Sequence, residues 1–511
     1  MTRITRREFI RAAGGFVSAA TIAPALLSRA GADEVRKPNI LFLMTDQHHH
    51  GVLGCAGDPL VKTPNLDKLA RDGVRFTNAV CATPFCSPTR ASLITGLWPH
   101  THGIQKNVQG KGVGLTDSAV FTEQILFDKG CRTAQMGKWH LGDTAALRCY
   151  KALGHDYYPE THKQYLKGIP EDKWDKPRDG DVVIGDVCYT PAMAEFCEKW
   201  TRETARSPQN LSTIGRSLIP PEYQYESWLA DKCIDLIKKY RDDSFMITWS
   251  VSPPHAPWVV PDPYYSMYDP ARIPMSPSHG DKPAAAYIDS EPSRFAAGLG
   301  EKGLRERLRC YYGQVTFMDA LVGRILDALK AQGLDNDTLV IYTSDHGDMQ
   351  TSHGMTDKSI VAFYEEILRV PLIARYPRTI KPGKVLNAHA NSVDLMPTFL
   401  DFAGQSIPKG IHGVSLKPLL EGKAADDDRP GFCERGQSIP GTSRMIRTHD
   451  WKYCVYGANR RELFDLTNDP YERHDLSADG SRKPIIEELH KRLRQQMEKT
   501  NDPALDLLPK A

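Results

Sequence analysis

Three apolar runs constrain the fold of this chain more than any other feature of its sequence. They are Ile40–Met44, Phe245–Val251 and Leu339–Thr343. A run without strict polar–apolar alternation is typical of a strand buried on both faces, as in a parallel sheet covered by helices. Because helix signals lie between the runs, the sequence predicts an α/β fold. We expect a large mixed, mostly parallel sheet flanked by helices.

Two helices between these runs have recognisable ends. Thr63-Pro64 favours a helix start, and Gly73 follows its end. A longer periodic segment, Leu304–Lys330, is followed by Gly333. The polar, irregular stretch Tyr150–Pro221 is interpreted as an insertion.

The pattern changes beyond about Gly404. Short strand-like pieces such as Arg444–Arg447 and Trp451–Tyr456 are followed by a helical segment from about Lys483 to Glu498. This predicts a smaller C-terminal α+β subdomain with a small antiparallel sheet and a terminal helix. We therefore expect three parts: residues 1–32, residues 33–403 and residues 404–511.

The first part, residues 1–32, resembles a twin-arginine export signal. Arg6-Arg7 precedes a mild apolar run from Ala12 to Leu27, and Ala30-Gly31-Ala32 is a small-x-small cleavage pattern. The run is shorter than the ~20 residues of a membrane-spanning helix, so we expect no stable membrane anchor. The resemblance implies the twin-arginine export machinery as a partner and a periplasmic or secreted protein. The alternative is an amphipathic N-terminal helix of the mature fold.

The net charge excludes one class of partner. The chain has a formal charge of +2, and loss of residues 1–32 would remove five arginines and one glutamate and leave −2. A nucleic-acid-binding protein is expected to carry a basic surplus, so we expect no nucleic-acid partner.

Polar residues gather where the expected strands end. In open parallel sheets, ligands bind beyond the carboxyl ends of the strands. Each cluster alone is a weak signal, since an aspartate after a strand is commonly a turn residue. Four such clusters together indicate a site, formed by Asp46, by Lys138 and His140, by His255, and by Asp345 and His346.

The most distinctive segment is Cys86-Ser87-Pro88-Thr89-Arg90. Ser87 is expected to cap a helix that has Pro88 at its first position and ends at Gly96. Cys86 would then lie at the positive end of that helix with Arg90 one turn along, which suits an anion and a reactive sulfur. The alternative is a buried, inert cysteine.

Five motifs in order resemble the formylglycine-dependent sulfatase family, of the alkaline phosphatase and sulfatase superfamily. The resemblance extends over about Pro38 to Leu476 and implies an alkaline phosphatase-like fold, with residues 33–403 as the catalytic sulfatase domain. In chain order, the motifs are Ile40 to Gln47, Cys86-x-Pro88-x-Arg90, Gly137 to Gly142, Pro254 to Pro257, and Ser344 to Gly347.

The resemblance implies that Cys86 is the modified residue, oxidised to formylglycine by a formylglycine-generating enzyme. One hydroxyl of the hydrated aldehyde would attack sulfur, and the second would expel the sulfate. Arg90 and Lys138 would stabilise position 86 and the bound sulfate, and His140 would assist the second hydroxyl. His255 and Lys358 would lie near the leaving oxygen, where a proton donor is required.

The resemblance also implies one divalent cation. Its expected ligands are Asp46, Gln47, Asp345 and His346, with the modified Cys86. Gln47 and His346 stand where many family members have aspartate and asparagine, so the site has fewer carboxylates. Ca²⁺ is expected from the resemblance, and Mn²⁺ or Mg²⁺ remains an alternative.

The expected function is that of an exported sulfatase acting on a sulfated glycan or a sulfated small molecule. His102 and His353 are predicted to contact the substrate. Two alternatives stay open: a formylglycine-dependent phosphonate monoester or phosphodiester hydrolase, and a catalytically inactive protein that binds sulfated glycans. The pair Gln47 and His346 also resembles the first alternative.

Overall fold

The computed structural model describes most of one compact unit, Lys37–Ala511. The residues expected to form the export signal lie outside the described residues, so that signal stays a prediction. In the described part of the chain, no helix is both long enough and apolar enough to cross a membrane. The described ranges are 37–108, 114–116, 118–142, 156–159, 169–204, 213–281, 290–358, 362–425, 428–436, 442–457 and 460–507.

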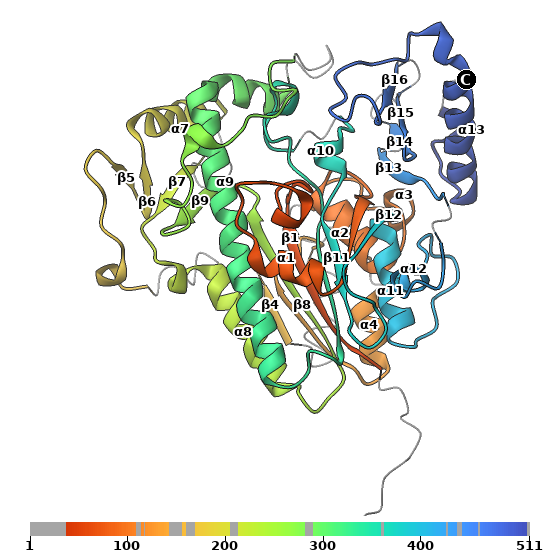
Figure 1. Ribbon diagram of the computed structural model, residues 1–511, viewed down its shortest axis with the longest axis horizontal. Helices are drawn as coiled ribbons and strands as arrows, with labels where there is room; N and C mark the ends of the chain where they lie inside the picture. Colours follow the sequence, from red (N-terminus) through yellow and green to blue (C-terminus); the bar gives the residue numbers. More distant parts are fainter. Residues whose placement is uncertain are drawn as a thin grey trace, which may run out of the picture. The chain divides into compact units, whose positions relative to one another are not determined.

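The main sheet has eight strands in the order β12-β2-β11-β10-β1-β8-β3-β4. Neighbours are parallel except around β11, which is antiparallel to both β10 and β2. The three apolar runs form β1, β8 and β10, and β1 lies between the other two. Figure 1 shows β1 and β8 in the sheet behind α1. The strands are β1 (Asn39–Asp46), β2 (Val74–Val80), β3 (Arg132–Gly137), β4 (Asp156–Pro159), β8 (Phe245–Pro254), β10 (Thr338–Ser344), β11 (Leu372–Arg375) and β12 (Lys384–Asn391).

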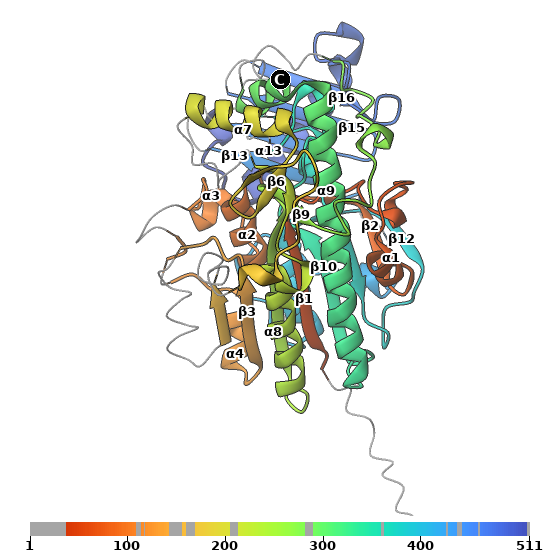
Figure 2. The ribbon, with the colours of Figure 1, turned by 90° about the vertical axis from the view of Figure 1, so that its left-hand side faces the viewer.

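Helices cover both faces of this sheet. Successive β1 side chains point to opposite faces, and both sets are buried and mostly apolar. Leu41 and Leu43 pack in one core cluster with α1, α8 and α9, and Phe42 and Met44 pack in another with α2, α4 and α11. Helices α8 and α9 run side by side in Figure 1 and Figure 2. The bounds are α1 (Pro64–Arg71), α8 (Tyr225–Lys239), α9 (Glu291–Ala331), α2 (Cys86–Thr95), α4 (Thr122–Asp128) and α11 (Leu395–Phe402).

Helix α9 is longer than the sequence predicts. The expected start was Leu304, whereas the helix begins at Glu291, where the Ser290 side chain accepts a hydrogen bond from the Ser293 N–H. A non-helical residue, Gly300, interrupts it with φ of 61°. This break separates the short first part from the predicted periodic segment.

The region interpreted as an irregular insertion contains regular structure. A second sheet has the order β5-β6-β7-β9, and α7 follows β6. Its last strand comes directly after the loop that carries His255. The elements are β5 (Val182–Ile184), β6 (Val187–Tyr189), α7 (Pro191–Thr204), β7 (Ile214–Ser217) and β9 (Trp258–Pro261). The strands of this sheet have only three or four residues, too few to show a period, while the 14-residue helix α7 was missed by the prediction.

The C-terminal part contains a four-stranded antiparallel sheet in the order β13-β14-β15-β16, followed by α13. Trp98, shortly after α2, packs edge-on against Phe432 with ring centroids 4.8 Å apart, so this sheet contacts the main body directly. The fold class predicted from the sequence is confirmed, while the boundary at residue 404 stays a prediction. The elements are β13 (Gly431–Arg435), β14 (Ser443–Arg447), β15 (Trp451–Tyr456), β16 (Arg460–Asp465) and α13 (Lys483–Lys499).

Three further α-helices of four residues each are described. They are α3 (Pro99–His102), α10 (Glu365–Leu368) and α12 (Lys417–Leu420).

Candidate active site

Cys86 is the first residue of α2, the buried helix that follows β2. The predicted cap is wrong, because the helix begins one residue before Ser87 and the Ser87 hydroxyl accepts a hydrogen bond from the Val108 N–H at 3.0 Å. Gly96 follows the helix end as predicted, with φ of 68° in the left-handed region that favours glycine. Cys86 therefore lies at the positive N-terminal end of the helix, as its motif indicates.

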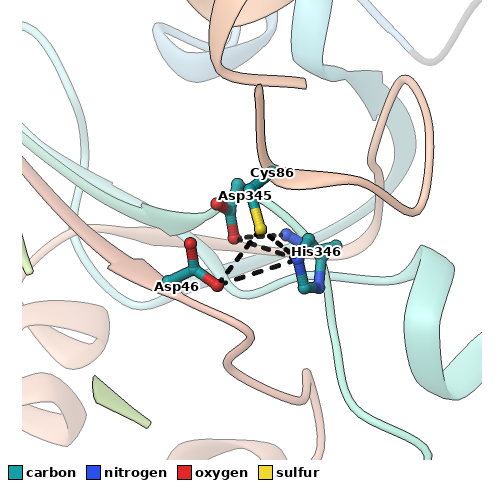
Figure 3. A group of neighbouring side chains, drawn as sticks. All are labelled: Asp46, Cys86, Asp345 and His346. Carbon is teal, nitrogen blue, oxygen red and sulfur yellow. Dashed lines mark hydrogen bonds and ion pairs between the residues drawn. The ribbon is translucent and has the colours of Figure 1, made fainter. Parts of the chain in front are cut away.

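The acidic residues predicted to bind the cation lie together at the carboxyl ends of β1 and β10, two parallel neighbours (Figure 3). Cys86 Sγ lies 3.7 Å from Asp46 Oδ1 and 3.2 Å from His346 Nε2. The same imidazole nitrogen lies 3.7 Å from Asp46 Oδ1 and 3.9 Å from Asp345 Oδ1. The fold thus brings together four predicted residues from three separate segments.

These four buried side chains fit a divalent cation, because one ligand atom of each lies within 4.8 Å of the others. His346 Nδ1 lies 2.9 Å from the Gly347 carbonyl. A carbonyl can only accept, so Nδ1 donates and Nε2 faces the carboxylates. Burial opposes a charge on the ring, but the negative charges of Asp345 and Cys86 raise the pKa of His346 to about 10, so a cation would have to displace a proton from Nε2 to bind there. Burial and the charge of Asp46 raise the pKa of Asp345 to about 6, and a bound cation would offset that repulsion.

Gln47 supplies a further oxygen. Its side-chain nitrogen donates to Asp348 Oδ2 at 2.6 Å and to Asp357 Oδ1 at 2.7 Å. Its backbone N–H donates to Asp345 Oδ1 at 3.1 Å. Among the described residues, its buried Oε1 has no hydrogen-bond partner. A neutral amide oxygen is a common ligand of hard cations, so Gln47 fits the predicted ligand set.

Arg90 lies against the acidic ligands and is buried. Its Nε donates to Asp345 Oδ2 at 2.8 Å, and Nη2 donates to Asp46 Oδ2 at 3.1 Å. Nη1 donates to the Lys138 carbonyl and to Ser250 Oγ, both at 2.8 Å. Lys138 Nζ forms an ion pair with Asp46 Oδ2 at 2.8 Å. Both predicted cations therefore orient the carboxylates, and their contact with a sulfate group stays a prediction.

Lys358 and His255 meet beside the sulfur. Lys358 Nζ lies 3.4 Å from Cys86 Sγ and 2.6 Å from His255 Nε2. His255 Nδ1 donates to the Ala256 carbonyl at 2.7 Å, so Nε2 can accept from the ammonium group. Burial would lower the pKa of Lys358, but the negative charges of Cys86 and Asp357 raise it, which keeps the side chain cationic.

Two parts of the chain match known family models. Residues 38–405 match the family model described as Sulfatase, which covers more than half of the chain. Residues 351–499 match the model described as N-sulphoglucosamine sulphohydrolase, C-terminal. The chain belongs to the sulfatase family.

Two similar known proteins are sulfatases that span most of this one. The ulvan-active sulfatase of Formosa agariphila is 29% identical over 92% of this chain and 83% of its own. The N-acetylglucosamine-6-O-sulfatase of Bacteroides thetaiotaomicron is 29% identical over 92% of this chain and 88% of its own. The chain is therefore a sulfuric ester hydrolase.

The chain is also similar to the solved structure of an enzyme with a different activity. A phosphonate monoester hydrolase from Silicibacter pomeroyi has a TM-score of 0.73 and is 25% identical, covering 92% of this chain and 97% of its own. The superfamily fold predicted from the sequence is thus shared by sulfatases and a phosphonate hydrolase.

In this sulfatase, two predicted histidines form no hydrogen bond with the Cys86 cluster that the described residues show. Among the described residues, His140 makes no hydrogen bond with Cys86 or with the acidic ligands, and its Nδ1 is buried without a partner. His353 is buried and stacks on Tyr364, with ring centroids 4.0 Å apart. The roles predicted for both residues stay predictions.

His102 is engaged within the protein. Its Nε2 lies 3.0 Å from Ser92 Oγ, and its Nδ1 accepts from the Ile104 N–H at 3.2 Å. These bonds tie α3 to α2, so His102 positions the turn that follows the sulfatase signature helix. Its predicted contact with the substrate is not tested by this arrangement.

Sequence reasoning missed three polar residues beside the predicted ones. Asn107 Nδ2 lies 3.9 Å from Cys86 Sγ, and Asp348 and Asp357 hold Gln47. Asp348 lies three residues after Asp345, which is the one signal that could have identified it. Asn107 and Asp357 lie in loops, where a single sequence offers no periodicity.

Arg90 and Lys138 also line a small cavity. It is lined mostly by apolar residues and by the carboxyl group of Glu123. Thr248 donates to Glu123 Oε1 at 3.4 Å, and Oε2 has no partner among the described residues. Burial raises the pKa of Glu123 to about 7, so this sulfatase carries an acid behind its cationic side chains that ionises near neutral pH.

Proposed function

We propose that this sulfatase is exported and hydrolyses a sulfate ester of a carbohydrate, using formylglycine at position 86 and one divalent cation. The observation that carries the proposal is the position of Cys86. Its sulfur lies at the helix N-terminus, 3.2 Å from His346 Nε2 on one side and 3.4 Å from Lys358 Nζ on the other. This sulfur occupies the place of the formylglycine oxygens in the modified protein.

Formylglycine supplies a geminal diol, a nucleophile that the encoded thiol does not provide. Asp46, Asp345, His346 and the Gln47 oxygen would hold the cation, which supplies positive charge beside the reacting oxygens. Ca²⁺ is our first choice, with Mn²⁺ or Mg²⁺ as alternatives, because the ligands combine oxygens with one imidazole.

The chain's own side chains supply the remaining roles. Arg90 and Lys138 keep Asp46 and Asp345 ionised and oriented. Lys358 carries the proton that the leaving alkoxide requires, and His255 fixes the ammonium group at 2.6 Å. We propose that His140 assists release of the sulfate.

Two observations support a carbohydrate sulfate. One relative at 29% identity is an ulvan-active sulfatase and another is an N-acetylglucosamine-6-O-sulfatase. Both comparisons extend over more than four-fifths of each chain. A sulfated small molecule is the simpler variant of the same substrate class.

A phosphonate monoester or phosphodiester hydrolase is the second candidate. It is favoured by the phosphonate monoester hydrolase with a TM-score of 0.73. Comparison of kcat/KM for sulfated monosaccharides, an aryl sulfate, a phosphonate monoester and a phosphodiester separates the candidates. Preference for the phosphonate over every sulfate would overturn the carbohydrate proposal, and absence of any turnover would favour an inactive glycan-binding protein.

Export and modification have their own test. The protein is expressed from its full-length gene together with a formylglycine-generating enzyme, and the periplasmic and secreted fractions are analysed by mass spectrometry. We expect mature chains starting near residue 33 and an aldehyde at position 86. An unmodified thiol in fully active protein would overturn the formylglycine mechanism, and retention in the cytoplasm would overturn the export proposal.

A further inference from the structure

One carboxylate oxygen connects the cation ligand Gln47 to the loop that carries Lys358. Asp357 Oδ1 accepts from Gln47 Nε2 at 2.7 Å and from the Lys358 backbone N–H at 2.7 Å. Lys358 is the next residue along the chain, and its Nζ lies 3.4 Å from Cys86 Sγ. The two halves of the site, which are 310 residues apart in sequence, therefore share one acceptor atom.

The Gln47 amide cannot rotate away while this acceptor is in place. One amide N–H donates to Asp357 and the other to Asp348 Oδ2 at 2.6 Å. Asp348 is anchored in turn by an ion pair with the buried Arg307. Because both amide hydrogens are used, only Oε1 remains as an acceptor, and it is the buried atom without a partner among the described residues.

Backbone conformation shows that the arrangement is held under strain. Gln47 has φ of 66° and Asp357 has φ of 65°, in the left-handed region that non-glycine residues rarely adopt. Such conformations persist only where the surrounding contacts over-determine them, and they cluster at functional sites. Both partners of the Gln47–Asp357 hydrogen bond therefore have a left-handed backbone conformation.

We propose that Asp357 is a positioning residue that holds the Lys358 loop against Gln47, so that the proton donor and the cation ligand keep one relative geometry. This inference rests on the proposed function for the role of Lys358 and of the cation. It also accounts for glutamine at position 47. A carboxylate there would have no N–H to donate to Asp348 and Asp357 and would be repelled by their negative charges.

The test uses two variants of the modified, metal-loaded enzyme. Asp357→Gly removes the acceptor but tolerates the left-handed backbone, since glycine adopts positive φ freely. Asp357→Asn is the matched control, because its Oδ1 can still accept both hydrogen bonds and asparagine also tolerates this conformation. Each is assayed on aryl sulfates whose leaving groups range from p-nitrophenol to unsubstituted phenol.

Loss of positioning should show most with the poorest leaving group, which depends most on proton donation. We expect Asp357→Gly to lose at least about tenfold more kcat on phenyl sulfate than on p-nitrophenyl sulfate, and Asp357→Asn to stay within about threefold of wild type on both. An equal loss of Asp357→Gly on all substrates would overturn the inference, as would a defect of Asp357→Asn as large as that of the glycine variant.

A second measurement does not depend on turnover. Calorimetric titration of Ca²⁺ into chelator-treated protein should give a Kd at least about tenfold weaker for Asp357→Gly than for wild type, as for removal of other residues that orient a metal ligand. An unchanged Kd would overturn the link to Gln47. Failure of wild type on every sulfate ester would instead refute the proposed function, while this titration would still test the link.

Discussion

His346 Nε2 lies 3.2 Å from the sulfur of Cys86, although 260 residues separate the two in sequence. The other ring nitrogen donates to the Gly347 carbonyl at 2.9 Å, so Nε2 is the nitrogen that faces the site. This relationship places Cys86, which we propose is modified, beside the ring nitrogen that we propose binds the cation. It explains why the sequence has histidine here without losing the capacity to bind a cation.

Substitution of Cys86, the residue that we propose is modified, should separate catalysis from folding. Cys86→Ala removes the nucleophile, and we expect kcat to fall by about 10⁴-fold or more. The side chain is small and buried, so its loss should lower the Tm by only a few degrees. Turnover of a sulfate ester and a thermal melt measure the two effects, and loss of the folded state would favour a structural role for this cysteine.

Removal of the cation should destabilise the protein as well as inactivate it. Asp46 and Asp345 are both fully buried, and a ligand bound only to the folded state adds about 2.7 kcal/mol at a concentration 100 times its Kd. Treatment with EDTA should therefore lower the Tm by several degrees and abolish turnover. Separate additions of Ca²⁺, Mn²⁺ and Mg²⁺ identify the ion, and a chelated enzyme with full activity would contradict the assignment.

Arg90 should not be replaceable by lysine. Its guanidinium group makes four hydrogen bonds of 2.8–3.1 Å, two of them to Asp345 and Asp46. A lysine cannot reproduce this planar arrangement, and breaking a buried ion pair costs about 3–5 kcal/mol. We expect Arg90→Lys to lower both the Tm and kcat, whereas Arg71→Lys, which changes an exposed arginine, should alter neither.

The stability of the protein should depend on the ionisation of Glu123. Burial raises its pKa from 4.5 to about 7, so between these values the unfolded chain is ionised while the folded protein remains protonated. The contribution of this carboxyl to the free energy of unfolding is therefore complete below about pH 4.5. It falls as the pH rises to about 7, by up to about 3 kcal/mol. Glu123→Gln removes this dependence.

The Tm of Glu123→Gln is compared with that of wild type at about pH 5 and about pH 8. We expect the difference, variant minus wild type, to be more positive at the higher pH by a few degrees. Glu222→Gln, a change at a surface residue, is the matched control. An equal difference at both pH values would mean that the Glu123 carboxyl does not titrate in this range.

The sequence predicted the strands of the main sheet more closely than the connections between them. The runs at Ile40, Phe245 and Leu339 form β1, β8 and β10, because a strand buried on both faces must be apolar along its whole length. The second sheet was missed, since strands of three or four residues are too short to show a period. The Ser87 cap was also wrong, because the exact first residue of a helix depends on neighbouring loops.

By itself, the sequence determined the sulfatase motifs and their location at the ends of strands, because these follow from local patterns of residue type. Only the tertiary structure decided which atoms meet. The hydrogen bonds of Gln47 to Asp348 and Asp357 join residues 301 and 310 positions apart, and neither aspartate belongs to a recognisable motif. Hydrogen bonds and ion pairs depend on distances of a few ångströms, which packing sets and the order of residues along the chain does not reveal.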